Sequence, residues 1–370
     1  MTSPANGRLL SLDALRGFDM MFIMGLSAII ADVCGLFPGG DDCWLARQMT
    51  HVSWAGLHHH DTIFALFLFI SGMTFPFSID KKRRQGLSDS AITISVIRRG
   101  LTLFALGLVY QGLFDLDFHN LRIPSVLGRI GLAWMAAAIL YCHTGKRTQW
   151  GIAAGILIGY YLLLRFAVAP DAPAGADSFS KAGNIAFYID RLLLPDNIYK
   201  PGVYDPEGIL GTIPAIVTAM LGMFTGRYVK ESTDSGERKT VKMLAAAVAL
   251  AAAASIWSNW FPIVKKLWTS TFVLACGAWS IGLFALFYYI IDVKEWRKGI
   301  LFFQVVGMNS ITIYMAQKII GFWPVTDYFF KGVSGILPGS CSRLVLDAGY
   351  FVVCWLFLYF LYNKKCFLKV

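Results

Sequence analysis

Charged residues are scarce in this chain, and their scarcity argues against most classes of soluble protein. Asp, Glu, Lys and Arg make up 15% of its 370 residues, whereas a soluble globular domain carries about 25%. The sequence also lacks a low-complexity tract and any stretch that resembles a separate soluble domain. Its seven Cys show no paired spacing of the kind that marks a zinc site or a disulfide framework. These absences favour an integral membrane protein with a single domain, residues 1–370.

Long apolar runs are what the chain has in abundance. Hydrophobic residues make up 56% of it, and about 20 consecutive apolar residues are needed for a helix to cross the hydrocarbon core of a bilayer. The sequence therefore predicts an all-α, polytopic membrane protein with about ten transmembrane helices, over residues 14–36, 61–79, 97–116, 124–143, 149–168, 208–229, 241–260, 269–291, 300–321 and 345–363.

The distribution of basic residues predicts the orientation. Most of the 33 Lys and Arg fall in segments that are cytoplasmic if the N-terminus is cytoplasmic, as the positive-inside rule requires. With ten spans, both termini lie in the cytoplasm. The net charge of +10 then reads as an insertion signal, and no nucleic-acid partner is expected. The first apolar run is too long for a cleavable signal peptide and has no small-residue cleavage site after it.

Ionisable residues at the span ends carry the functional information, because their burial in lipid is costly. His51 and Asp61 flank the start of the second span on the external side. A carboxylate beside a His fixes its tautomer and stabilises the imidazolium, as a general base or nucleophile requires. The alternative is an interfacial loop anchored by Trp54, with Asp61 capping a helix. The run His58–His60 is not expected to bind a metal, because only His58 shares a helix face with Asp61.

Two further external segments carry unexpected charge. Arg122 precedes the fourth span and Arg129 lies one to two turns inside it, where either an ion pair with a carboxylate or an anionic ligand would account for it. Asp205 precedes the sixth span and is a ready helix cap before a proline. Capping does not explain Glu207, and two carboxylates on an external face would suit hydrogen bonds to a sugar or an amine. Both interpretations stay open.

The other polar candidates lie deeper or on the cytoplasmic side. Asn309 falls near the middle of the ninth span. A basic group lies at the cytoplasmic ends of the second and third spans; it serves either as a topology signal or as a site for the phosphates of a nucleotide-bearing donor, and comprises Lys81, Lys82, Arg83, Arg84, Arg98 and Arg99. Of the cysteines, Cys43 and Cys341 map to the external side, where a disulfide between them stays open if that compartment is oxidising.

Seven short motifs occur in one order along the chain. They are Ser11-Leu-Asp-Ala-Leu-Arg-Gly17, His51-Val-Ser-Trp54, Asp61 to Gly72, Arg122-Ile-Pro-Ser-Val-Leu-Gly-Arg129, Tyr204-Asp-Pro-Glu-Gly-Ile-Leu-Gly-Thr-Ile213, Lys266-Leu-Trp-Thr-Ser270 and Gly307-Met-Asn-Ser-Ile311. In this order they resemble the membrane region of the heparan-alpha-glucosaminide N-acetyltransferase family and its bacterial relatives. The resemblance covers essentially the whole chain.

The resemblance implies an acyltransferase that takes acetyl from cytoplasmic acetyl-CoA and delivers it to an amino sugar on the other face of the membrane. His51 matches the active-site His of the family and Asp61 its acidic residue at the head of the second span, while Arg122, Asp205, Glu207 and Asn309 match motif positions. Ser27 stands where the animal enzyme has an Asn. The luminal N-terminal domain of the lysosomal enzyme has no counterpart here, which implies a multi-pass protein of a plasma (inner) membrane. The family also suggests a homodimer.

The chemistry that these residues would perform is acyl transfer. We expect His51 to act as general base or to carry the acetyl group covalently, Asp61 to orient it, and Asn309 or Arg129 to polarise the carbonyl. Arg122, Arg129, Asp205 and Glu207 would hold the acceptor, and no metal is expected. The alternative from another class is a secondary transporter for a sugar or amino sugar, which ten spans and buried charges suit equally well. A related alternative is O-acylation of a lipid-linked or cell-wall glycan. The sequence does not identify the acceptor.

Overall fold

The computed structural model describes residues 9–194 and 196–368, and within these ranges the chain is helical with only two isolated β-bridges. The predicted all-α, multi-pass fold is therefore confirmed. The ends of the chain, residues 1–8 and 369–370, lie outside the described residues, and the cytoplasmic side of both termini stays a prediction.

Eight helices in the described residues are long and apolar enough to cross a membrane. The first, Leu10–Cys34, consists of α1 (Leu10–Met21), a π-helical turn η1 (Phe22–Leu26) and α2 (Ser27–Cys34), with Gly25 at a positive φ inside the turn. The others are α4 (His59–Arg84), α5 (Asp89–Tyr110), α6 (Val126–His143), α7 (Lys146–Phe166), α10 (Gly236–Trp257), α11 (Ser270–Tyr288) continued by η5 (Tyr289–Val293), and α15 (Gly339–Asn363).

The predicted ninth span is broken, and the predicted sixth is not strongly apolar. α12 (Ile300–Gly307) and α13 (Ser310–Ile319) meet at an angle of 64° and form one bent span at most, which brings the count to nine. The segment predicted as 208–229 forms α9 (Thr212–Glu231), a 20-residue helix that is not among these spans. Because α9 is largely buried among other helices, it does not need a lipid-compatible surface.

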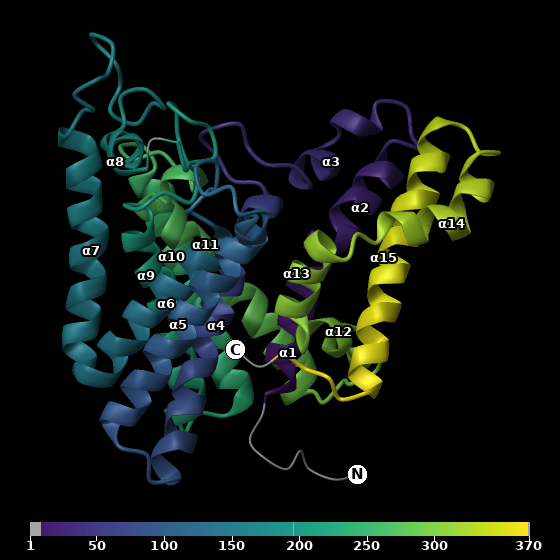
Figure 1. Ribbon diagram of the computed structural model, residues 1–370. Helices are drawn as coiled ribbons and strands as arrows, with labels where there is room; N and C mark the ends of the chain where they lie inside the picture. The colour runs from purple at the N-terminus through teal and green to yellow at the C-terminus, as the bar shows by residue number, and fades with distance from the viewer. Residues whose placement is uncertain (1–8, 195, 369–370) are drawn as a thin grey trace.

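The helices form two groups (Figure 1). α4, α5, α6, α7, α9, α10 and α11 lie in one group, and α1 and α2 lie with α12, α13 and α15 in the other. Each group has its own hydrophobic core, and Leu12 and Leu15 of α1 extend into the larger one.

Glycines allow the closest helix contacts in both groups. A Cβ at Gly72 would overlap the carbonyl oxygen of Ala219, and one at Gly222 would overlap that of Phe69, so α4 and α9 touch backbone to backbone. α1 and α12 meet in the same way at Gly17 and Gly307. Such small-residue contacts are typical of helices that associate within a membrane.

Three helices that do not span gather toward one end of the molecule (Figure 1), which we call the outer end. They are α3 (Trp44–Gln48), α8 (Ile185–Leu193) and α14 (Trp323–Ser334). The loops at this end position the next spans through side-chain caps: Ser125 accepts from Gly128 N at 3.0 Å to start α6, and Thr269 accepts from Phe272 N at 3.3 Å to start α11. The described cysteines are all free, Cys43 and Cys341 included, so the disulfide considered from the sequence is not formed.

Candidate active site

The predicted pair of His51 and Asp61 is formed. His51 lies in the loop before α4, and its Nδ1 is 2.8 Å from Oδ1 of Asp61 in the first turn of that helix. Oδ2 of Asp61 accepts from the backbone N–H groups of Val52 and His58, each at 3.2 Å. The carboxylate is 2% exposed, while the His51 side chain is 54% exposed. Asp61 thus holds the Nδ1–H tautomer of His51, which leaves the Nε2 lone pair free to take a proton or attack a carbonyl.

Lys265 completes this group from a distant part of the chain. It belongs to the 3-10 turn η4 (Lys265–Leu267) before α11, and its Nζ lies 3.2 Å from His51 Nδ1 and 3.6 Å from Asp61 Oδ1. Burial lowers the pKa of the Lys265 ammonium, and the charge of Asp61 offsets part of that effect. A partly buried ammonium beside the imidazole is suited to stabilise negative charge that develops on a substrate oxygen.

A second His stands against the first. His60 packs its ring 4.5 Å from the ring of His51, centroid to centroid. Its Nδ1 is 3.0 Å from Oγ of Ser27, at the start of α2. His60 is therefore held between the kinked first span and the catalytic candidate, and it shapes the space into which His51 faces.

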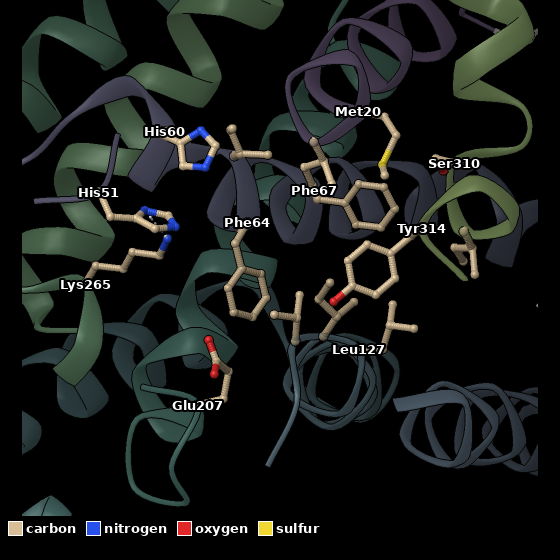
Figure 2. Close-up of a pocket in the computed structure, with 15 residues that line it drawn as sticks. Met20, His51, His60, Phe64, Phe67, Leu127, Glu207, Lys265, Ser310 and Tyr314 are labelled. Carbon is tan, nitrogen blue, oxygen red and sulfur yellow. Dashed lines mark hydrogen bonds between the residues drawn. The ribbon is translucent and has the colours of Figure 1, made fainter. Parts of the chain in front are cut away.

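These side chains face a cavity of about 180 Å³ that is otherwise apolar (Figure 2). His51, His60, Lys265 and Glu207 supply its charged and titratable groups. Phe64, Phe67, Leu127 and Tyr314 cover much of the rest, and Met20 and Ser310 bring in the second helix group. The cavity therefore lies between the two groups of helices, with its reactive groups near the outer end.

Arg122, Asp205 and Glu207 form one ion-pair network. Arg122 donates from Nε and Nη2 to the two oxygens of Asp205, at 2.8 and 2.6 Å, and also pairs with Glu207. Burial lowers the pKa of Arg122, but the hydrogen bonds to Asp205 and the charge of Glu207 outweigh it, so its pKa is raised. Asp205 is fully buried and accepts two backbone N–H groups as well. Its oxygens are thus occupied within the protein, while Glu207 reaches the cavity.

Arg129 lies beneath the site. Its Nη2 donates to the carbonyl oxygen of Gly208 at 2.9 Å, and its guanidinium lies 5.1 Å from the ring centroid of Trp268. Arg129 is 2% exposed, and its Nε and Nη1 have no hydrogen-bond partner among the described residues. No carboxylate of the described chain is within ion-pair distance of it, so the ion pair with a carboxylate that was considered from the sequence is not formed.

Asn309 occupies the break between α12 and α13. It is buried, its Oδ1 accepts from Thr312 at 3.3 Å, and its Nδ2 has no partner among the residues the structure describes. Its neighbour Ser310 lines the cavity, on a different helix group from His51. Asn309 itself is not among the residues that line the cavity.

The basic group of the second and third spans lies in two places: Lys81–Arg84 form the end of α4 that is far from His51, whereas Arg98 and Arg99 lie about half-way along α5. Its members face different ways: Lys82 donates to Ser95 at 2.6 Å, Arg83 pairs with Asp89 at 3.1 Å, and Arg99 lies over the ring of Trp134. Lys81, Arg84 and Arg98 are exposed. The structure therefore separates Lys81–Arg84 from the His51 site by the length of a span, but it places Arg98 and Arg99 within a span rather than at its end, because α5 already begins at Asp89.

Sequence reasoning missed Lys265 as a site residue and gave His60 no role. Lys265 directly precedes the recognised Lys266-Leu-Trp-Thr-Ser270 motif, but it is 214 positions from His51 and nothing local in the sequence signals their contact. The signal for His60 was its place in the His run beside Asp61. No cluster of three or more metal-ligating side chains occurs in residues 9–194 and 196–368.

The fold and the site together define a polytopic membrane protein with a carboxylate-oriented His at the outer end of an intramembrane cavity. Two curated proteins place this chain among named relatives. It is 27% identical, over 98% of its length, to "Heparan-alpha-glucosaminide N-acetyltransferase" of Homo sapiens. It is 26% identical, over its full length, to the protein of the same name from Mus musculus. No protein-family model matches the chain.

The resemblance inferred from the motifs is confirmed by these relatives, which extend over nearly the whole chain. The chain in turn spans 60% and 61% of the length of the two relatives. Their names support an acyltransferase as the class of enzyme.

Proposed function

We propose that this protein is a transmembrane acetyltransferase that moves acetyl from cytoplasmic acetyl-CoA to the amine of an amino sugar at the outer face. The observation that carries the proposal is the His51–Asp61 pair, with Nδ1 held at 2.8 Å and Nε2 left free beside an intramembrane cavity. The names of the curated relatives support the same reaction. In this proposal, His51 and Asp61 form the centre of the active site.

In the transfer step, the amine nitrogen attacks the thioester carbonyl carbon and loses a proton, the carbon–sulfur bond breaks, and CoA leaves as a thiolate that takes up a proton. His51 Nε2 is placed to accept the proton of the amine, and the Asp61 carboxylate stabilises the resulting imidazolium. Lys265 is placed to stabilise the oxyanion. Lys265 replaces Arg129 as our candidate for stabilising the oxyanion, because Arg129 is buried and its Nη2 donates to the Gly208 carbonyl.

The same geometry allows His51 to take the acetyl group first. In that route Nε2 attacks the thioester, CoA leaves, and the amine then attacks the acetyl-imidazole. The two routes differ in whether CoA is released before the acceptor binds. Exchange of labelled CoA into acetyl-CoA, without any acceptor, distinguishes them: it occurs only through the covalent route.

Glu207 and Arg122 are our candidates for holding the acceptor. Glu207 lines the cavity and can accept a hydrogen bond from a sugar hydroxyl or an amine, and Arg122 fixes its position. Asp205 serves them by holding Arg122 rather than by contacting the sugar. Away from His51, the basic group Lys81–Arg84 with Arg98 and Arg99 would bind the phosphates of acetyl-CoA. Asn309 stays a candidate for polarising the acetyl carbonyl, since its neighbour Ser310 lines the cavity.

Transfer in liposomes tests the proposal. Purified protein is reconstituted with acetyl-CoA on one face and glucosamine on the other, and CoA release is followed. We expect release that depends on glucosamine and falls about 10²–10⁴-fold in His51→Ala, the usual contribution of a general base. His119→Ala is the control: His119 is exposed in the loop between α5 and α6 and does not line the cavity.

Two results would overturn the proposal. Unchanged transfer in His51→Ala removes His51 from the chemistry. An absence of acetyl-CoA turnover, together with exchange of labelled glucosamine across the liposome, identifies a transporter instead.

A further inference from the structure

A groove separate from the His51 cavity opens on the flank of the larger helix group. It has a volume of about 790 Å³ and lies between α10, α11, the first turn of α4, the kinked first span and α3. Its walls on α10 and α11 include several small residues, among them Ala247, Ala251 and Ala278. Because α10 is only 22% buried along its span, this groove faces the surroundings of the bundle, which in a membrane are lipid chains.

The polarity of the groove changes along its length. Its polar side chains lie at the outer end: Gln48 on α3, His58, His59 and Thr62 at the start of α4, and Ser255 near the end of α10. Deeper in the span the lining is Ala247, Val248, Phe18 and Leu283. Ser255 and Ala247 are eight residues apart on α10, or about 12 Å along a helix. No Asp, Glu, Lys or Arg of the described chain lines the groove.

Two features at the outer end favour an amphiphile over a bulk lipid tail. His59 lines this end, and its buried Nε2 has no hydrogen-bond partner among the described residues, so a ligand hydroxyl would supply the partner that it lacks. Trp44 of α3 is 74% exposed and lines this end of the groove. Exposed Trp at this level is typical of the membrane–water interface, where a headgroup lies.

The groove and the His51 cavity share a wall. The first turn of α4 presents His59 to the groove and His60 to the cavity. His58, also in the groove, bonds through Nδ1 to the carbonyl oxygen of Thr50 at 3.0 Å, and Thr50 directly precedes His51. A headgroup at the outer end of the groove is therefore separated from His51 by one short loop.

We propose that the acceptor is a membrane amphiphile, an amino sugar joined to a hydrocarbon chain, with its chain in this groove and its sugar directed to His51. The inference rests on the proposed acetyl transfer and specifies its acceptor class. The groove matches such a molecule in its polar outer end, its apolar depth and its contact with the site. A soluble amino sugar would leave the apolar part of the groove without a role.

The test compares acceptors that differ only in the chain. Purified protein in nanodiscs is given acetyl-CoA with either methyl glucosaminide or decyl glucosaminide. We expect a KM about tenfold or more lower for the decyl compound, since each buried methylene contributes several-fold to binding. Partition of the decyl chain into the bilayer also lowers the KM, and variants separate the two effects.

Ala251→Phe fills the groove from an exposed position of α10, and Ala252→Phe, also exposed but outside the lining, is its matched control. Only Ala251→Phe should raise the KM for decyl glucosaminide toward that of methyl glucosaminide, with kcat for the methyl compound unchanged. Equal KM values for the two acceptors, or equal effects of the two variants, would overturn the inference. Loss of a dimer in Ala251→Phe with no change in chain preference would assign the groove to a second copy and overturn it too.

A catalysis-free measurement keeps this inference distinct from the proposed function. Decyl glucosaminide with a diazirine at the end of its chain should label peptides of α10 and α11 near Ala247 and Leu283, less in Ala251→Phe than in Ala252→Phe. Labelling without acetyl transfer would overturn the proposed function and support the groove as an amphiphile site. Transfer to methyl glucosaminide without such labelling would support the enzyme and overturn the groove.

Discussion

At the scale of single residues, the site is defined by two charged groups, Asp61 and Lys265, that lie against the same imidazole nitrogen of His51. Nδ1 of His51 carries one proton at most in the neutral ring, and that proton is directed to Asp61 at 2.8 Å. The ammonium of Lys265 lies 3.2 Å from the same nitrogen. Because Nδ1 already carries a proton, it has no lone pair to accept a hydrogen bond from Lys265. Its charge is therefore available to a substrate oxygen, which makes the protonation state of Lys265 the most sensitive variable of the site.

That protonation state predicts a pH dependence. Burial disfavours the charged ammonium, so the pKa of Lys265 is lowered from the ordinary Lys value of about 10.4. The charge is present below the lowered pKa and is lost as pH rises through it. We expect kcat/KM to fall on the alkaline side at a lower pH than an ordinary Lys would give. The pH–rate profile of the purified enzyme measures this limb.

Substitutions at position 265 identify the group responsible. Lys265→Arg keeps a positive charge to higher pH and should move the alkaline limb upward, while Lys265→Met should remove the limb and lower the rate. Lys266→Arg is the control, since Lys266 donates to the Ser53 carbonyl and does not line the cavity. An alkaline limb that stays in place in Lys265→Arg would assign it to another group.

The contrast between local and distant contacts explains what the sequence could predict of the site. His51 and Asp61 are ten positions apart, and Asp61 begins a helix, so their pairing could be inferred from one short segment. Arg122 lies 83 positions from Asp205. The sequence showed that each charge is unusual at its position. It could not show that the two residues pair, because their pairing depends on how α6 and α9 pack. Lys265 was missed for the same reason.

At the scale of elements, hydropathy predicted where helices occur and failed where helices bend. A run of about 20 apolar residues has one low-cost conformation in lipid, because a helix satisfies its own backbone hydrogen bonds. The break between α12 and α13 and the π-helical turn at Gly25 leave the apolar pattern intact. Both bends border the cavity, through Ser310 and Ile23. Hydropathy alone therefore did not predict the two bends that help to shape the site.

The contact between α4 and α9 gives a prediction at this scale. Gly222→Ala puts a methyl group against the Phe69 carbonyl and must separate the two helices. We expect a loss of about 1–3 kcal/mol, the usual cost of overpacking, seen as a lower midpoint of thermal unfolding in detergent. Gly155→Ala is the control: a Cβ there has no neighbour within 4 Å, so the better helix former should leave the midpoint unchanged or raise it. Equal midpoints for the two variants would contradict the close contact.

At the scale of the whole molecule, function depends on which end of the bundle faces the cytoplasm. The basic residues Lys81–Arg84, at the end of α4 that is far from His51, predict that this end is cytoplasmic. Acetyl-CoA would then meet the protein at one end and the acceptor at the other.

Labelling of Cys366 tests this orientation. Cys366 is exposed, and it follows α15, whose start near α14 belongs to the outer end. A membrane-impermeant maleimide should therefore label it in inverted membrane vesicles and spare it in intact cells. Cys366→Ser should abolish that labelling. Labelling of Cys366 in intact cells would reverse the orientation and place His51 in the cytoplasm.

The glycine contacts also bear on how the molecule moves. α4 with α9, and α1 with α12, are joined so closely that neither pair can slide or part without losing its packing. The cavity is lined from both helix groups, by Phe64 and Lys265 on one side and by Ser310 and Tyr314 on the other. The close contacts within each group favour an opening in which the two groups move relative to each other as blocks, as the halves of carriers do when they alternate their access. A catalyst built in this way would expose its His to one compartment at a time, and would hold the bilayer sealed during each turnover.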